Sequence, residues 1–453
     1  MEKLKYERPI IKSLNTGLMN KFGTKTEYNA LTHIDGVAVR DIIKDYGSPT
    51  FVYSEKKIRD NYQDAKRAFE TRYPKVQFAW SYKTCYLNAV CNIYHQEGSW
   101  AEVVSRFEYD KAINNGVPGN KIIFNGPEKT EDDLTTAVKN DSLIHIDHFD
   151  ELYLLTRIAE NLKKKPRVAI RVNMDTGIYP IWDRFGFNYE SGQAWEAITK
   201  IIISDKLNLV GLHCHIGTYM LSTNAYAIAA SKLSDLALGI KQKFNKRIEY
   251  LDLGGGFPSK NTLKGSYQVA ADYIPEISEF ADAICNTLLN MGFPYDELPF
   301  LYLETGRALI DDAGFLLGSV IANKRLSDGR KATIMDFGVN LMFTSFWYDH
   351  KITPAQPFGY HTEDTVLYGP LCMNIDVVRE NINLPPLNKS DQVVVHYVGA
   401  YCITQSMQFI ALRPNVVLID TRGQTHVIKS SDDLAILEQN EKKPAHLQSI
   451  ENE

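Results

Sequence analysis

A regular alternation of short apolar runs and longer amphipathic segments constrains the fold of this chain more than any other feature. Between residues 75 and 307, each run of strand length precedes a charged segment in which apolar residues recur with the helical period of about 3.6 residues. Eight runs have the strand pattern: VQFAWSYK, SWAEVVS, KIIFNGP, LIHIDHF, RVAIRVN, LVGLHCHIG, YLDLGGG and FLYLETGR. Eight such units favour an α/β fold, a (β/α)8 or TIM barrel, over a doubly wound sheet, which usually contains fewer strands.

The helical period ends near residue 310, and β-rich runs follow one another from there. This change of pattern predicts a C-terminal all-β domain after the barrel. The run PTFVYS at 49–54 is a strand candidate ahead of the barrel that is also suited to join the β domain. We expect four parts: an N-terminal extension at 1–48 that contributes to the β domain, the barrel at 49–309, the β domain at 310–430 and a polar tail at 431–453.

Composition and charge exclude several classes of function. At 453 residues the chain is long enough for two or three domains, and its net charge of −5, without an extended basic block, argues against nucleic-acid binding. No run approaches 18 apolar residues and the N-terminal segment lacks the apolar core of a secretory signal, so we expect a cytoplasmic protein that crosses no membrane. Six cysteines without CxxC spacing argue against a zinc ribbon and against a dense disulfide framework.

Lys83 raises the first functional question, because it ends an apolar strand in the stretch FAWSYKTCY. Burying an ammonium group costs several kcal/mol unless the group is paired or loses its proton, so this lysine is either a salt-bridged structural residue or a reactive amine. Other predicted strands also end at polar residues or glycines: Ser105, Asn125, Asn173, His215, Gly254, Gly255, Gly256 and Glu304. Barrel active sites are built at that end of the strands, which favours the reactive amine.

The three consecutive glycines in LDLGGGFP have two interpretations. Gly254, Gly255 and Gly256 directly follow a predicted strand, where backbone N–H groups can approach an anion closely. A phosphate cradle and a tight structural turn account for the pattern equally well. The spacing fits neither a dinucleotide fingerprint nor a Walker motif.

A histidine pair suggests a different class of enzyme. His213 and His215 in GLHCHIGT lie on one face of a strand and would suit zinc in a barrel hydrolase. A zinc site needs further ligands, and His145 and His148, on another strand, have the wrong parity to share a face. The pattern therefore favours a site without metal.

Taken in order, the motifs YKT, AEVVS, FNGPEKT, HCHIGT, GGG, E-x-GR, GP-x-C and GAY resemble those of the fold-type III pyridoxal-phosphate decarboxylases, the group of diaminopimelate and ornithine decarboxylases. The resemblance spans residues 45 to 425 and is nearest to the diaminopimelate decarboxylase branch. It implies an alanine racemase-like arrangement of a barrel and a β domain. It also implies an amino-acid carboxy-lyase with pyridoxal 5'-phosphate as cofactor.

The resemblance implies a role for each motif. Lys83 would bind the cofactor covalently through its amine, which requires an uncharged amine and hence a lowered pKa. His215 would stack on the cofactor ring, and Glu304 would pair with the pyridine nitrogen and so favour decarboxylation over racemisation. The phosphate would be held by Gly254, Gly255, Gly256, Thr218, Arg307 and Tyr401.

The sequence departs from this family where the far end of the substrate would bind. Thr344 in NLMFTSFWY replaces the arginine of a motif like NDLIRPALY, which grips the distal carboxylate of diaminopimelate, whereas Tyr348 is kept. Met373 in CMNID replaces the acid that holds the distal ammonium. The predicted substrate-binding residues are Arg307, Thr344, Tyr348, Met373 and Asn374.

These departures lead to one main hypothesis and three alternatives. The main hypothesis is decarboxylation of an amino acid with a neutral or bulkier far end, such as an amide-linked or carrier-linked amino acid of a specialised pathway. The first alternative is a true meso-diaminopimelate decarboxylase of lysine biosynthesis. The others are a zinc-dependent barrel hydrolase that uses His213 and His215, and a catalytically silent homologue that only binds the cofactor.

The resemblance finally implies a homodimer with shared active sites and no nucleic-acid or membrane partner. Cys372, the fourth predicted catalytic residue beside Lys83, His215 and Glu304, would reach the cofactor from the partner subunit and return a proton there. Arg184 in DRFGF would pair across the interface with Asp376 in CMNID. The other partner is the small-molecule or carrier-linked amino-acid substrate.

Overall fold

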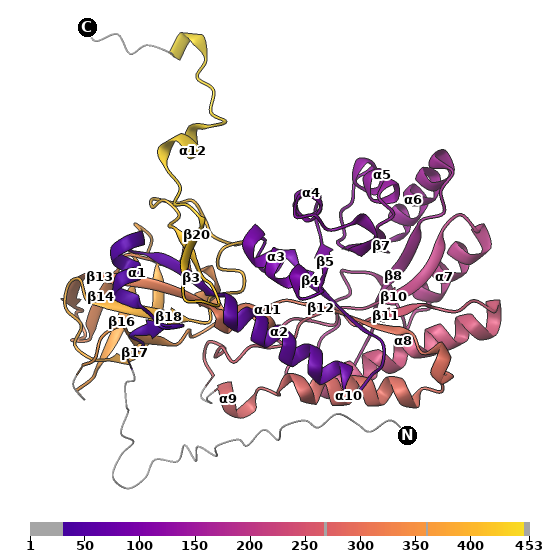
Figure 1. The fold of residues 1–453 in the computed structure, drawn as a ribbon, viewed down its shortest axis with the longest axis horizontal. Helices are drawn as coiled ribbons and strands as arrows, with labels where there is room; N and C mark the ends of the chain where they lie inside the picture. The colour runs from indigo at the N-terminus through magenta and orange to yellow at the C-terminus, as the bar shows by residue number, and fades with distance from the viewer. Residues whose placement is uncertain (1–29, 267–269, 359–360, 448–453) are drawn as a thin grey trace.

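Two structural units lie side by side in the computed structural model, which describes residues 30–266, 270–358 and 361–447 (Figure 1). One unit is a closed barrel of parallel strands with helices around it, and the other is a β domain. Both the predicted barrel and the predicted C-terminal β domain are confirmed.

Eight parallel strands close the barrel, and they are the eight that the sequence predicts. The ring runs in the order β4, β5, β6, β7, β8, β10, β11 and β12, and β12 pairs with β4 to complete it. The strands are β4 (Val76–Ser81), β5 (Trp100–Val103), β6 (Ile122–Phe124), β7 (Leu143–Ile146), β8 (Arg167–Asn173), β10 (Asn208–His213), β11 (Tyr250–Asp252) and β12 (Phe300–Thr305). The short β9 (Phe187–Asn188) pairs with β8 outside the ring.

Helices follow the barrel strands and pack around the ring (Figure 1). Their ends carry the signals that the sequence offers: Ser54 accepts the Lys57 N–H at the start of α2, and Thr130 with Asp133 forms a capping box at the start of α5. The α-helices of this unit are α2 (Glu55–Glu70), α3 (Asn88–Gln96), α4 (Arg106–Asn114), α5 (Glu131–Lys139), α6 (Phe149–Leu162), α7 (Gln193–Ser204), α8 (Thr223–Phe244), α9 (Ala270–Tyr273), α10 (Ile277–Asn290) and α11 (Arg307–Ile310). Its 3-10 turns are η1 (Tyr82–Thr84), η2 (Gly119–Lys121), η3 (Tyr295–Glu297) and η4 (Asp311–Ala313).

The β domain is built on one sheet whose order is β17, β16, β14, β13, β3, β19 and β20, with β18 attached to β13 and β15 attached to β18. Its strands are β3 (Thr50–Ser54), β13 (Gly314–Arg325), β14 (Lys331–Met335), β15 (Ile352–Pro354), β16 (Glu363–Tyr368), β17 (Val377–Leu384), β18 (Gln392–His396), β19 (Val416–Ile419) and β20 (Thr425–Lys429). A 3-10 turn, η5 (Phe343–Phe346), precedes β15.

The pairing of β3 places the start of the barrel unit later in the sequence than predicted. β3 pairs antiparallel with β13 and parallel with β19, so the segment at 50–54 belongs to the β domain and the barrel unit begins with α2. The N-terminal extension also joins the β domain as far as it is described: β1 (His33–Ile34), β2 (Val37–Ala38) and α1 (Val39–Tyr46) pack on it through an apolar cluster. The tail contains the exposed α12 (Leu434–Glu438) and η6 (Ala445–Leu447).

The barrel interior has an aromatic floor below a polar layer. Tyr250 and Tyr302 stack with ring centroids 4.3 Å apart, and Gly211 makes room for them, because a Cβ there would lie 2.2 Å from the Tyr250 ring. The Tyr250 hydroxyl contacts His145 Nε2 at 2.9 Å, where the polar layer begins. The floor therefore supports the polar side chains that face the C-terminal ends of the strands.

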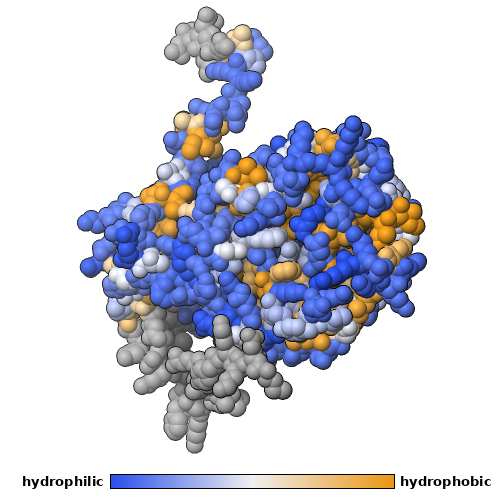
Figure 2. All heavy atoms as spheres, turned by 45° about the vertical axis from the view of Figure 1, so that its right-hand side comes forward, coloured by the Kyte–Doolittle hydropathy of each residue, from blue (hydrophilic) through white to orange (hydrophobic). Residues whose placement is uncertain are grey.

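The surface is mainly hydrophilic, with separate apolar patches on the face that Figure 2 shows. Among the described residues, no helix combines the length and the apolar character that a membrane span requires.

A fully buried ion pair ties the barrel loops together. Lys129 Nζ lies 2.9 Å from Glu151 Oε1, with the two side chains 0% and 2% exposed. The ammonium also donates to the Gly126 carbonyl oxygen, so its charge is satisfied on two sides. Removing one member of such a pair leaves the other charge buried without compensation.

We expect Lys129→Met to lower the free energy of unfolding by about 3–5 kcal/mol, because Glu151 would remain buried and unpaired. Chemical denaturation followed by circular dichroism measures the change. The matched control is Lys206→Met, since Lys206 pairs with Glu160 at 3.1 Å while both side chains are about half exposed; its loss should stay below about 1 kcal/mol. Equal losses in the two variants would contradict the assignment.

Candidate active site

A cavity of about 260 Å3 opens at the C-terminal ends of the barrel strands. Eight residues singled out from the sequence line it: Lys83, Thr218, His215, Gly255, Gly256, Glu304, Arg307 and Tyr401. They come from segments that are far apart in the sequence and meet because the strands are parallel and the ring is closed. This is the end at which barrel enzymes place their chemistry.

Lys83 lies in the turn η1 directly after β4 and faces a buried carboxylate. Its Nζ is 2.9 Å and 2.8 Å from the two oxygens of Glu102, which is fully buried at the end of β5. Burial alone would lower the pKa of Lys83, but the carboxylates of Glu102 and then Glu304 outweigh it and raise this pKa above its ordinary value. The lowered pKa expected from the sequence is therefore wrong for Lys83 beside its charged partner.

Asn125 links the two carboxylates of the pocket. Its Nδ2 donates to Glu102 Oε1 at 3.0 Å and also to Glu304 Oε1. The sequence placed Asn125 at a strand end without assigning it a role. Its amide holds Glu304 on the pocket wall and connects it to the acid that pairs with Lys83.

His215 presents an uncharged ring at the cavity. Burial, reinforced by Arg171, lowers its pKa to about 3, and its Nδ1 accepts the Gly255 N–H at 3.1 Å. The Trp182 ring packs beside it at a centroid distance of 5.6 Å. A neutral, fixed imidazole suits the stacking role that the resemblance implies.

The glycine run is dictated by close packing. A Cβ on Gly255 would lie 2.3 Å from the Glu304 carbonyl oxygen, and one on Gly256, whose φ is +91°, would lie 2.2 Å from the Gly217 carbonyl oxygen. Gly254 and Gly255 donate their N–H groups to Asp252 and His215. The tight-turn interpretation is confirmed, since two of the N–H groups donate within the turn. The phosphate cradle stays a prediction, for which the Gly256 N–H is left among the described residues.

Arg307 is a buried cation, and some of its N–H donors have no acceptor among the described residues. Its guanidinium lies 4.6 Å from the centroid of Tyr348 and 4.9 Å from that of Tyr401, and its Nη1 is 3.6 Å from Asp311 Oδ2. Nε and Nη1 are buried but have no hydrogen-bond partner among the described residues. Such a group is a ready receptor for a phosphate or a carboxylate.

These groups fit pyridoxal phosphate. An amine, a neutral ring, a buried carboxylate and an arginine with unpartnered donors border one cavity. They match the cofactor's aldehyde, ring, pyridine nitrogen and phosphate in chemical type.

Six predicted site residues are not among those that line this cavity: Gly254, Thr344, Tyr348, Cys372, Met373 and Asn374. Cys372 and Asn374 are exposed on a loop of the β domain, and Met373 between them is partly exposed. Thr344 is 1% exposed, and its hydroxyl contacts His350 Nε2 at 2.9 Å and Cys402 Sγ at 3.1 Å. The hydroxyl of Thr344 therefore faces the β-domain interior and not the cavity.

Asp376, the predicted partner of Arg184 across a dimer interface, makes its described contacts within its own chain. Its side chain is buried, and its two oxygens accept the backbone N–H groups of Val339 and Leu371 at 2.8 Å and 2.7 Å. A carboxylate engaged in this way holds its own loop, and its pairing with Arg184 of another subunit stays a prediction. Arg184 lies over the Phe185 ring.

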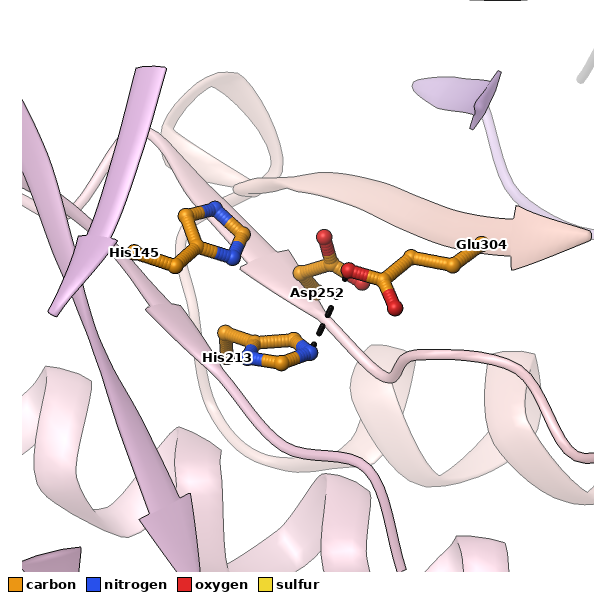
Figure 3. Close-up of side chains that lie close together, drawn as sticks. All are labelled: His145, His213, Asp252 and Glu304. Atoms are coloured by element: carbon orange, nitrogen blue, oxygen red, sulfur yellow. Dashed lines mark ion pairs between the residues drawn. The ribbon is translucent and has the colours of Figure 1, made fainter. Parts of the chain in front are cut away.

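The two histidines of GLHCHIGT lie in different surroundings. His215 borders the cavity, whereas His213 is buried in the barrel with His145, Asp252 and Glu304 (Figure 3). His148 is apart from His145, as its parity predicted, because it caps α6. The sequence reasoning missed that His145 and His213 meet, with ring centroids 4.7 Å apart.

Comparison with known proteins supports the geometry. The model of the family "Pyridoxal-dependent decarboxylase, pyridoxal binding domain" matches residues 55–311, more than half of the chain. The diaminopimelate decarboxylase of Methanocaldococcus jannaschii is 30% identical over 91% of this chain and 95% of that protein, and that of Bacillus subtilis is 28% identical over 87% and 91%.

A solved structure gives the same result. The crystal structure of the M. jannaschii diaminopimelate decarboxylase superposes with a TM-score of 0.84 at 30% identity, covering 92% of this chain and 96% of that one. Sequence, fold and pocket agree, and the chain belongs to the pyridoxal-dependent decarboxylase family as an amino-acid carboxy-lyase that uses pyridoxal phosphate.

Proposed function

We propose that this decarboxylase acts on an amino acid whose far end is neutral or bulky, such as an amide-linked or carrier-linked amino acid. The observation that carries the proposal is the residue type at two positions of the sequence. Thr344 and Met373 stand in place of the cation and the acid expected for diaminopimelate. Family membership also replaces the zinc hydrolase alternative.

The side chains in contact with Thr344 are also uncharged. Its hydroxyl contacts His350 and Cys402, and burial lowers the pKa of His350 to about 4, so the imidazole is uncharged at neutral pH. A bidentate contact between arginine and a carboxylate contributes roughly 1.5–3 kcal/mol. Its absence would reduce the preference for diaminopimelate about tenfold to more than a hundredfold.

The residues of the pocket have distinct tasks. Bound pyridoxal phosphate supplies the electron sink for the pair of electrons left when CO2 departs. Glu102, 2.8 Å from Lys83 Nζ, is placed to take the proton that this amine must lose before it binds the cofactor covalently. Glu304 would keep a proton on the pyridine nitrogen, and Arg307 would bind an anionic group.

A true meso-diaminopimelate decarboxylase is the second candidate. The observation in its favour is that the related proteins reported above carry that name. The two candidates share the cofactor and the reaction and differ only in what binds the far end of the substrate.

We expect Lys83→Ala to abolish both CO2 release and the visible absorption band of bound cofactor that borohydride removes, because Lys83 carries the only amine among the described residues that line the cavity. Far-ultraviolet circular dichroism should be unchanged. Lys121→Ala, at the exposed last position of η2, is the matched control and should keep the band. A Lys83→Ala protein that retains the band would show that another lysine binds the cofactor.

We expect kcat/KM for meso-diaminopimelate to be at least about tenfold below that for the best amide-linked amino acid, measured as CO2 release over a panel that includes lysine, ornithine and arginine. Met373→Glu should raise kcat/KM for substrates with a distal ammonium. Ile375→Glu adds the same charge at an exposed neighbouring position and should not. Diaminopimelate as the best substrate by a wide margin would reject the main proposal in favour of the second candidate.

We also propose that two chains form a homodimer with shared active sites. Two observations support this proposal. Cys372 is exposed and lies outside the cavity of its own chain. Large apolar side chains are exposed on the same loop, on the loop before β9 and on or near η5: Ile178, Ile181, Trp182, Phe346, Trp347 and Ile375.

We expect a mixture of inactive Lys83→Ala and inactive Cys372→Ala proteins to recover roughly a quarter of wild-type activity after subunit exchange. Half of the dimers would be mixed, and one of their two sites would hold both intact residues. Lys83→Ala mixed with Glu304→Gln is the control without recovery, since Lys83 and Glu304 line the cavity of one chain. No recovery in the first mixture, with exchange demonstrated, would place Cys372 outside the partner's site.

A further inference from the structure

A buried carboxyl pair borders the cavity from inside the barrel. Asp252 ends β11 and Glu304 lies near the end of the adjacent β12, and the two carboxyl groups face each other (Figure 3). Asp252 is fully buried, while Glu304 is 4% exposed and lines the cavity. Ligand-type oxygens of the two side chains lie within 4.8 Å of each other. Two buried carboxyl groups at this separation repel each other unless one of them carries a proton.

The surrounding donors are divided unequally between the two groups. Glu304 Oε1 accepts from Asn125 Nδ2 and lies 3.2 Å from His213 Nε2. Asp252 Oδ1 accepts the Gly254 N–H at 2.8 Å, but its buried Oδ2 has no donor among the described residues. Glu304 is therefore the better-solvated anion, and Asp252 is the group that needs a proton.

Within the part of the chain that the structure describes, no nearby cation is available to neutralise both carboxylates. Burial lowers the pKa of His213 and of His145 well below the ordinary value, so both imidazoles are neutral. The charged groups that face the pair from the other strands and loops are already matched with one another: Lys83 with Glu102, Arg171 with Asp147, and Lys129 with Glu151. Two ionised carboxylates would leave buried negative charge uncompensated.

We propose that Asp252 is a positioning residue that, as a neutral carboxylic acid, donates a hydrogen bond from Oδ2 to Glu304 and holds Glu304 ionised and directed at the cavity. The proposal rests on the role of Glu304 toward the pyridine nitrogen and adds the group that sets its protonation. A donor to Glu304 stabilises its anion and so favours the proton on the pyridine nitrogen. Burial and the neighbouring Glu304 raise the pKa of Asp252 well above its ordinary value, in agreement.

A divalent cation is the competing occupant of this cluster. Ligand-type atoms of His145, His213, Asp252 and Glu304 all lie within 4.8 Å of one another. A metal would bind Asp252 as an anion, whereas the proposal requires a protonated acid. Metal analysis of the purified holoenzyme therefore separates the two, and a stoichiometric metal ion that is lost in Asp252→Asn would overturn the proposal.

The direct test is infrared spectroscopy of the holoenzyme. The difference spectrum between wild type and Asp252→Asn should contain one carboxylic-acid C=O band at neutral pH, and labelling the aspartates with carbon-13 should shift it. This readout depends on neither substrate nor turnover. No acid band, or a band that aspartate labelling leaves in place, would overturn the proposal.

The functional test compares two replacements of Asp252. Asparagine can accept the Gly254 N–H and donate to Glu304, as the protonated acid does, whereas leucine can do neither. We expect Asp252→Leu to lower kcat/KM about ten- to a hundredfold more than Asp252→Asn does. Equal losses would overturn the proposal; if Asp252→Leu does not fold, the infrared comparison still decides.

The nitrogen-15 resonance of cofactor labelled at the pyridine nitrogen reports the consequence for the ring. It should move toward the unprotonated position in Asp252→Leu and stay near the wild-type position in Asp252→Asn. His145→Asn, which removes a ring from the same layer without removing a donor to Glu304, should leave it in place. A resonance that is the same in wild type and Asp252→Leu would overturn the proposal, whereas an unprotonated pyridine nitrogen in the wild-type holoenzyme would instead refute the role of Glu304 on which the proposal rests.

Discussion

Closure of the barrel between its first and last strands is the constraint on which the site depends. β12 pairs with β4 in parallel register, with Glu304 beside Ala79 and Thr305 beside Trp80. Lys83 follows β4 directly, so this one pairing brings the amine and the carboxylate of the pocket together. An open sheet with the same strands would leave the two at opposite edges, and no local feature of either strand could compensate.

A closed ring also buries its polar groups together, so their charges must be compensated by one another. The aromatic floor of Tyr250 and Tyr302 fills one end of the barrel, and the polar side chains above it are packed against each other at very low exposure. Each buried charge therefore needs a partner of opposite sign, a hydrogen bond or a proton. Lys83 and Glu102 neutralise each other as an ion pair. For Asp252 and Glu304, the proposed proton on Asp252 removes one of the two negative charges.

The sequence was sufficient for the elements that depend on local periodicity. All eight barrel strands were predictable because a buried parallel strand is a continuous apolar run followed by a helical period. The pairing partners of a strand cannot be predicted from its local sequence. β3 is an example, because all five of its residues are buried and would suit a strand of either unit.

The site was predictable where side chains lie at strand ends and not where their charge depends on a neighbour. Lys83, His215 and Glu304 were found from their positions. The raised pKa of Lys83 comes from Glu102, a residue inside a motif whose own role was not assigned. The contact between the His145 and His213 rings depends on the stagger of the strands around the barrel. The alternation of side chains within a single strand does not predict that stagger.

Arg307 shows how few charged donors this pocket has for its anions. The cofactor phosphate and a substrate carboxylate both need hydrogen-bond donors, yet the N–H groups of Gly254 and Gly255 already donate to acceptors within their own chain. The guanidinium lies between the Tyr401 ring, which borders the cavity, and the Tyr348 ring, which does not. Its planar fork has donors on more than one edge, and both Nε and Nη1 are unpartnered among the described residues, so one arginine can address two anions at once. Thr344 supplies no cation for a second, distal carboxylate at the position where an arginine is expected, and this difference supports the proposed substrate with a neutral far end.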